Sequence, residues 1–92
     1  MIQSFKDENT AELFLHGRNR RWANIATVAI RKLDMLDSAP VLHDLSMPPG
    51  NRLEALTGDR KGQHSIRINN QYRICFVWHE DGAVEVEITD YH

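Results

Sequence analysis

The chain has 92 residues, of which 41% are hydrophobic and 26% charged, and its formal net charge at neutral pH is −2. This length predicts one domain spanning residues 1–92, and the charge argues against a uniformly basic, non-specific nucleic-acid binder. No apolar run approaches the roughly 20 residues that cross a membrane, and the first residues lack a signal-peptide pattern, so we expect no membrane association. A lone cysteine, Cys75, lies in an apolar run and favours a reducing, cytoplasmic location.

The first forty residues predict a short strand and two helices. Residues 2–5 are the strand candidate. Asn9, followed three residues later by Glu12, resembles a capping box and predicts a short helix that closes at Gly17. A second, amphipathic helix is predicted by apolar residues at helical spacing, namely Trp22, Ile25, Ala26, Ala29, Leu33 and Leu36.

The second half of the chain is predicted to be a meander of strands. Residues 41–47 fit either a turn of helix or a loop, and residues 48–50 (Pro-Pro-Gly) form a rigid break. Period-two apolar alternation predicts strands in four segments, residues 52–56, 64–68, 72–78 and 84–88. The expected fold class is therefore α+β, in the order β-α-α-β-β-β-β, with two helices on one face of an antiparallel twisted sheet.

The strand register brings two arginines together. If Ile66 pairs with Ile74 on the core face, Arg67 lies opposite Arg73 on the other face. Like charges directly opposed across strands are destabilising, so either Glu85, Glu87 or a bound anion lies between them, or they belong to an Arg–Glu ladder on a solvated face. A next hairpin closed at His79 and Ala83 around a three-residue loop would place Arg73 opposite Thr89.

The last three residues, Asp90, Tyr91 and His92, place an acid, a phenol and an imidazole directly after the final strand. Histidine titrates near neutral pH and, with an adjacent carboxylate, suits acid–base catalysis; a frayed terminus is the alternative. The five histidines have no metal-ligand spacing, so no metal or other cofactor is expected. Cys75 fits a buried structural thiol better than a nucleophile.

Arginines, a tyrosine and a histidine without a metal suit cleavage of a phosphodiester by its neighbouring 2′-hydroxyl. A base takes the hydroxyl proton, cations stabilise the negative charge that grows on the phosphate, and an acid protonates the leaving 5′-oxygen. Arginine suits the phosphate role because its planar fork donates two parallel hydrogen bonds. The substrate would be RNA, because DNA has no 2′-hydroxyl. Basic residues gather in two segments, so phosphate binding would depend on a local patch. One segment holds Arg18, Arg20, Arg21, Arg31 and Lys32, and the other holds the candidate phosphate contacts Arg52, Arg60, Lys61 and Arg67 together with Arg73.

Several stretches resemble HigB-type toxins of the RelE/ParE toxin–antitoxin superfamily. They are Leu-Thr-Gly-Asp-Arg at residues 56–60, Ser-Ile-Arg-Ile at 65–68, Tyr-Arg-Ile-Cys-Phe at 72–76 and the closing Asp-Tyr-His at 90–92. The resemblance covers almost the whole chain and implies a compact fold like that of microbial RNases. It further implies cleavage of mRNA in the ribosomal A site, and neutralisation by a helix-turn-helix antitoxin encoded by the adjacent gene. Contact with DNA would then be only indirect, through the antitoxin.

The resemblance also implies residue roles. Arg73 and Arg67 match the phosphate-binding arginines of the family, and Asp90, Tyr91 and His92 match its catalytic group. Arg18, Arg20 and Arg21 are candidates for contact with the ribosome. Studied relatives carry a His and a Lys shortly before the Gly-Asp-Arg, where this chain has Glu54 and Thr57. Glu54 is therefore a candidate base.

Two other functions remain open from the sequence. One is a ParE-like toxin that inhibits DNA gyrase without cleaving RNA. The C-terminal residues that match the catalytic group of the HigB family argue against this alternative. The other is a weakly active member that acts mainly through its antitoxin complex, which the loss of two cations at Glu54 and Thr57 motivates.

Overall fold

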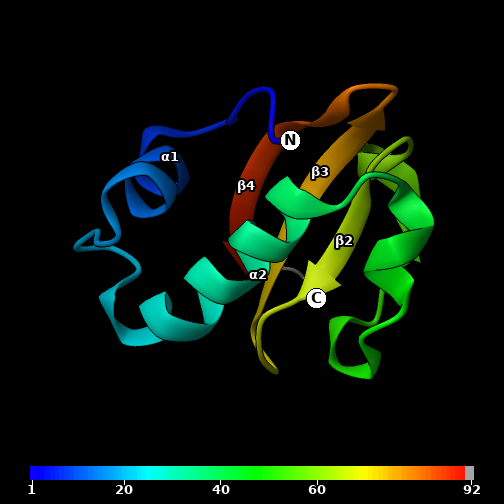
Figure 1. Ribbon diagram of the computed structural model, residues 1–92. Helices are drawn as coiled ribbons and strands as arrows, with labels where there is room; N and C mark the ends of the chain where they lie inside the picture. The colour runs from blue at the N-terminus through cyan, green and yellow to red at the C-terminus, as the bar shows by residue number, and fades with distance from the viewer. Residues whose placement is uncertain (91–92) are drawn as a thin grey trace.

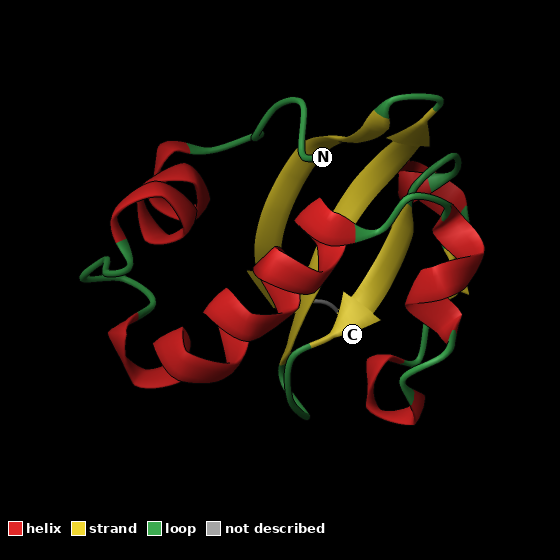
Figure 2. Ribbon diagram, in the orientation of Figure 1, coloured by secondary structure: helices red, strands yellow, loops and turns green. Residues whose placement is uncertain are grey.

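The computed structural model describes residues 1–90, which form two α-helices, four 3-10 helices and one four-stranded antiparallel sheet (Figures 1 and 2). The elements in chain order are α1 (Glu8–His16), η1 (Ala23–Ile25), α2 (Ala26–Ser38), η2 (Leu42–Ser46), η3 (Pro49–Asn51), β1 (Glu54–Ala55), η4 (Gly58–Arg60), β2 (His64–Arg67), β3 (Tyr72–His79) and β4 (Gly82–Asp90). Neither described helix is both long enough and apolar enough to cross a membrane. The predicted α+β class, with two helices on an antiparallel meander, is confirmed.

The first predicted strand is reduced to a single bridge. Phe5 pairs with Val86 in a parallel direction, and the backbone N–H of Gln3 donates to the carbonyl of Ala83 at 2.7 Å. The chain leaves this extended path at once, because α1 begins at Glu8. The N-terminal segment therefore covers only the first half of the β4 edge.

Helix α1 starts earlier than the capping-box pattern predicts. Its N-cap is Asp7, whose Oδ2 accepts the backbone N–H of Thr10 at 3.0 Å. Asn9 lies inside the helix instead, and its Oδ1 accepts from the side-chain amide of Asn19 at 3.0 Å. The predicted close at Gly17 is confirmed, because Gly17 has a φ of 77° and its N–H donates to the carbonyl of Leu13.

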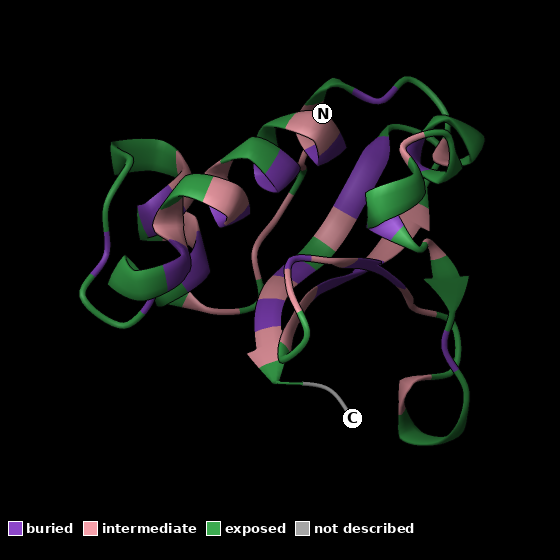
Figure 3. Cartoon of the chain, turned by 90° about the horizontal axis from the view of Figure 1, so that it is seen from below, coloured by how far each residue is buried: buried purple, intermediate pink, exposed green. Residues whose placement is uncertain are grey.

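The core lies between the helices and one face of the sheet. Helix α2 crosses that face and α1 lies beside β4 (Figure 1). Buried stretches appear on the helices and along the strands in Figure 3. The largest fully buried apolar side chains are Phe76, Leu13, Leu33, Leu36, Leu45, Ile66, Ile74 and Val86. Most of the predicted apolar positions therefore face this core, but Val84 pairs with Val77 on the opposite face, and none of residues 52–56 is among the buried residues of the core cluster.

The segment between α2 and the sheet is anchored by a buried lysine. Lys32 Nζ donates to Asn51 Oδ1 at 2.5 Å, and the Asn51 amide donates to the carbonyl of Leu45 at 3.0 Å. Arg52 follows in the left-handed region at φ 45°, and the strand predicted over residues 52–56 shortens to Glu54–Ala55. The ambiguous residues 41–47 contain a 3-10 helix, η2.

The register is confirmed at the arginine pair but not at the hairpin. Ile66 pairs with Ile74, Arg67 with Arg73, and Arg73 with Thr89. The β3–β4 hairpin closes between His79 and Gly82, so the predicted three-residue loop is wrong. A bulge with Glu85 at φ 54° adds one residue to β4, and the pairing beyond it returns to the predicted register.

Candidate functional site

The two arginines project from the sheet face opposite the helices, because directly paired residues of antiparallel strands share a face. Arg73 is held at three points. Its Nε donates to Ser65 Oγ at 2.7 Å, and its Nη2 donates to the carbonyl of Arg52 at 2.7 Å. Glu54 Oε1 lies 3.9 Å from the same Nη2. The Arg73 side chain is only 14% exposed, so its guanidinium is fixed in place.

Arg67 has a separate partner. Its Nη2 donates to Asn70 Oδ1 in the turn between β2 and β3. The expectation that Glu85 or Glu87 separates the two arginines is wrong. Glu85 lies exposed in the bulge, and Glu87 binds other cations. Among residues 1–90, the only carboxylate in a salt bridge with Arg73 is Glu54.

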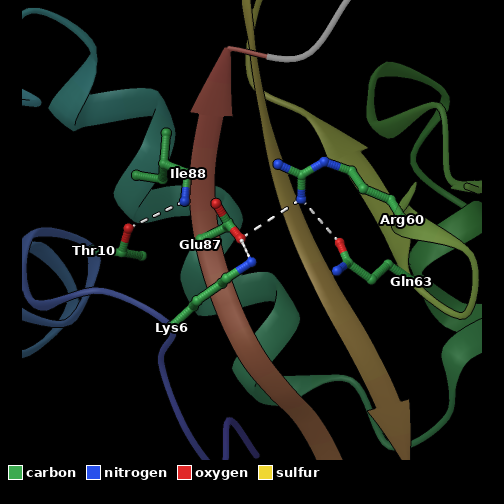
Figure 4. A network of polar contacts seen from close by, with 6 residues as sticks. All are labelled: Lys6, Thr10, Arg60, Gln63, Glu87 and Ile88. Carbon is green, nitrogen blue, oxygen red and sulfur yellow. Dashed lines mark hydrogen bonds and ion pairs between the residues drawn. The ribbon is translucent and has the colours of Figure 1, made fainter. Parts of the chain in front are cut away.

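A second polar cluster surrounds Glu87 (Figure 4). Its Oε2 lies 3.1 Å from Lys6 Nζ and 3.6 Å from Arg60 Nη1. Arg60 also donates to Gln63 Oε1 at 3.0 Å, so a side chain from η4 reaches across the sheet to β4. The short Gly-Asp-Arg turn thus places Arg60 beside the sheet.

Cys75 lies beneath this charged layer and is fully buried. Burial raises the pKa of its thiol, and this effect exceeds the opposing influence of Arg60 and Arg73. A raised pKa keeps the thiol protonated at neutral pH, where it is a poor nucleophile. This agrees with the structural role predicted for Cys75.

The remaining phosphate-binding candidates lie at the edge of this face. The Arg52 and Lys61 side chains are exposed, and Glu54 is 53% exposed. The structure thus brings Arg67, Glu54 and the backbone of Arg52 close to Arg73. Arg60 reaches Glu87 on β4 instead. Lys61 forms none of the hydrogen bonds or ion pairs found among the described side chains.

The C-terminal residues are described only as far as Asp90. Asp90 pairs with Tyr72, one position beyond the Arg73–Thr89 pair, and its Oδ2 accepts from Gln71 Nε2 at 3.0 Å. Strand alternation places the Asp90 side chain on the Tyr72 side of the sheet, away from Arg73. Tyr91 and His92, the other two predicted catalytic residues, lie outside the described residues.

The basic loop between the helices is ordered by an asparagine. Asn19 is buried, and its side chain binds Asn9, Glu12 and the backbone N–H of Trp22. The side chains on either side of it are exposed, namely Arg18, Arg20 and Arg21. Arg21 lies over the indole of Trp22, with its guanidinium carbon 5.0 Å from the ring centroid.

Sequence reasoning missed the residues that orient the cations. Ser65 is fully buried and accepts from Arg73, while Lys6 and Gln63 join the Glu87 cluster. The signal for Ser65 was available, because it shares the period-two face with Arg67. Lys6 had no such signal, because its partner lies 81 positions away along the chain. Among residues 1–90, no group of three or more His, Cys, Asp or Glu side chains could hold a metal ion.

Residues 3–92 match the family model of the RelE-like toxin of the type II toxin–antitoxin system HigB. The chain belongs to this HigB family of toxins. Toxin HigB-1 of Vibrio cholerae serotype O1 is 41% identical over 80 residues, which cover 85% of this chain and 84% of that protein. An uncharacterized protein of Haemophilus influenzae is 33% identical over 76 residues, covering 80% and 75% respectively.

A solved structure shares the fold of this HigB-family chain. The YoeB-YefM complex from Staphylococcus aureus contains a chain that aligns with a TM-score of 0.57 at 14% identity, covering 100% of this chain and 98% of that one. The predicted HigB-type resemblance is thereby confirmed as family membership, and the predicted RelE-like architecture is confirmed as the fold.

Proposed function

We propose that this type II toxin is a metal-independent endoribonuclease that cleaves mRNA on the ribosome and so stops translation. The observation that carries the proposal is the placement of Glu54 Oε1 3.9 Å from a guanidinium that Ser65 and the Arg52 backbone hold rigidly. A candidate base thus lies beside a preorganised cation, which is the arrangement that phosphoryl chemistry requires.

In the proposed reaction, Glu54 takes the proton of the 2′-hydroxyl. The 2′-oxygen then bonds to phosphorus while the bond from phosphorus to the 5′-oxygen breaks, and His92 protonates the leaving oxygen. Arg73 and Arg67 stabilise the charge on the non-bridging oxygens. Tyr91 completes the catalytic group, whereas Asp90, predicted to belong to it, lies on the opposite face from Arg73 and takes no direct part. Arg52, Arg60 and Lys61 bind flanking phosphates. Action on ribosomes would place the protein in the cytoplasm, with Arg18, Arg20 and Arg21 as candidate ribosome contacts.

Programmed ribosomes and mapping of mRNA 5′ ends test this proposal. We expect Arg73→Ala, His92→Ala and Glu54→Gln each to lower the cleavage rate by about 100-fold or more, the usual scale for a general acid or base. Arg31→Ala, an exposed change on α2, is the matched control. Unchanged cleavage by all three variants would reject the site. If only the Glu54→Gln variant cleaved faster, Glu54 would not be the base, and its charge would instead weaken the binding of phosphate by Arg73.

The proposed partner is a helix-turn-helix antitoxin encoded by the adjacent gene. Membership of a type II toxin–antitoxin family supports an antitoxin, and the structural neighbour from S. aureus is named as a YoeB-YefM complex. Growth arrest on expression alone, relieved by the adjacent open reading frame, is the expected result. Intact mRNA together with inhibited supercoiling would instead favour a gyrase-directed toxin.

A further inference from the structure

A cleft of about 490 Å³ opens beside the end of β4, on the edge of the sheet next to Asp90. It lies between the start of α1, the Arg21–Trp22 segment and the last residues of β4. We call it the β4 cleft, and its lining includes Asp7, Arg21, Trp22, Tyr72, Glu87 and Asp90. Its volume falls within the roughly 300–1,000 Å³ range of small-molecule sites.

Three side chains that line the β4 cleft carry buried polar atoms without hydrogen-bond partners within residues 1–90, and one of these atoms, Glu87 Oε2, is ion-paired with Lys6 and Arg60 instead. Trp22 is 4% exposed, and its indole N–H has no acceptor among residues 1–90. Asp7 Oδ1 has no donor there, although its other oxygen caps α1. Buried polar groups are normally paired, so one donor and one carboxylate acceptor have unmet hydrogen-bonding capacity in residues that line the cleft.

The lining also offers flat surfaces. The Arg21 guanidinium lies over the Trp22 ring, and Tyr72 meets that ring edge-on with centroids 5.3 Å apart. Planar guanidinium and aromatic groups are the surfaces on which proteins stack unpaired nucleobases. A planar heterocycle therefore fits this lining better than an aliphatic ligand does.

The charge of the lining indicates which heterocycle fits best. Three carboxylates (Asp7, Glu87 and Asp90) stand against one arginine in the lining, although Glu87 also pairs with Lys6 and Arg60, and Asp90 accepts from Gln71. This balance disfavours a phosphate group and favours a ligand with several N–H donors beside one acceptor. Guanine presents N1–H and N2–H₂ beside O6, whereas each other base presents fewer donors.

We propose that the β4 cleft binds a guanine base of the RNA substrate, with Asp7 accepting from guanine N–H groups and the Trp22 indole donating to O6. This inference rests on the proposed endoribonuclease function, and it adds a base-recognition subsite next to the catalytic group. Trp22 and Asp7 act as specificity residues there. The phosphate binds on the opposite face of the sheet, which carries Arg67 and Arg73.

Direct binding is tested with the full chain by titrating GMP, AMP, CMP and UMP while recording the two tryptophan indole N–H resonances. We expect GMP to shift the Trp22 resonance most and to leave the Trp78 resonance in place. Trp22→Phe keeps a ring but removes the donor, and should weaken GMP binding about threefold to tenfold. Trp78→Phe is the matched control. The proposal is overturned by equal shifts with all four nucleotides, by no shift at millimolar GMP, or by a larger response to arginine amide, which would indicate a protein side chain instead.

A second variant changes the polarity of the cleft without removing the helix cap. Asn is as good an N-cap as Asp, so Asp7→Asn retains α1 but turns the open acceptor into a donor. We expect this variant to cleave ribosome-bound mRNA while losing its preference for guanine next to the cut. Cleavage with an unchanged base preference would reject the β4 cleft as a guanine-binding site and leave the proposed endoribonuclease function intact. GMP binding without any mRNA cleavage would reject the proposed function and keep the cleft.

Discussion

At the scale of single residues, Ser65 shows how a small buried side chain prepares a larger functional one. Its hydroxyl accepts from Arg73 Nε at 2.7 Å, and the Arg52 carbonyl accepts from Nη2. Together they fix the guanidinium plane before any phosphate arrives. Fixing the plane lowers the conformational entropy lost on binding, because a free arginine side chain must give up about 2 kcal/mol of rotamer freedom.

The first prediction concerns Ser65→Ala. Losing one hydrogen bond of about 1 kcal/mol should lower ribosomal cleavage about fivefold, and the free energy of unfolding should fall by about 1–3 kcal/mol because Arg73 Nε is left without its buried acceptor. Ser65→Thr keeps the hydroxyl and should restore cleavage. Equal cleavage by the alanine and threonine variants would contradict a positioning role for this hydroxyl.

At the scale of elements, the segment from η2 to β1 is attached to α2 through Lys32. The lysine is 7% exposed, and its ammonium binds the fully buried Asn51. The next residue, Arg52, accepts a hydrogen bond from Arg73 through its backbone carbonyl. Helical spacing places Lys32 in line with Ala29 and Leu36, on the buried side of α2. Its partner lies 19 residues away, directly after the Pro-Pro-Gly break.

The second prediction concerns Lys32 and pH. Burial, reinforced by Arg31 and Arg67, lowers the pKa of Lys32 in the folded state. The folded protein therefore holds fewer protons than the unfolded chain between this lowered pKa and about 10.4, so the free energy of unfolding should rise with pH in that window.

Urea unfolding at neutral and alkaline pH measures this effect. Lys32→Met should lack the rise, and at neutral pH it should lose about 1–3 kcal/mol because Asn51 Oδ1 is left without its donor. Arg31→Met, the exposed neighbouring change, should keep a smaller rise, because it removes one nearby charge and leaves the burial of Lys32 in place. A pH slope that survives in Lys32→Met would show that another group causes it.

At the scale of the whole molecule, the two sheet edges are protected differently. Edge β1 has only two residues, and the first half of β4 is covered by the N-terminal segment. Ser4 accepts from Val86 N–H at 3.1 Å, and Ile2 N–H donates to Asp37 on α2 at 2.8 Å. Further along β4, Thr10 Oγ1 accepts the Ile88 N–H at 3.1 Å (Figure 4).

The third prediction is that deleting residues 1–4 opens the first half of the β4 edge. Exposed strand edges pair with other chains, so the shortened protein should associate as its concentration rises, while the complete chain stays at one size. Size-exclusion chromatography with light scattering measures this. Gln3→Ala keeps the backbone pairing and serves as the control. A truncated protein of constant size at every concentration would show that the segment does not protect this edge.

Short-range patterns along the chain are enough to predict the elements that depend on them. Alternation placed Ile66 opposite Ile74, and because side chains on a strand alternate between faces, the Arg67–Arg73 pairing followed. Only the tertiary structure decided which groups meet those arginines. Glu54 and Ser65 join Arg73, and Glu87 joins Arg60, through contacts between segments whose relative placement no local pattern encodes. The β4 cleft has the same origin, because Asp7, Trp22 and Tyr72 come from three distant segments that meet only when both helices pack on the sheet.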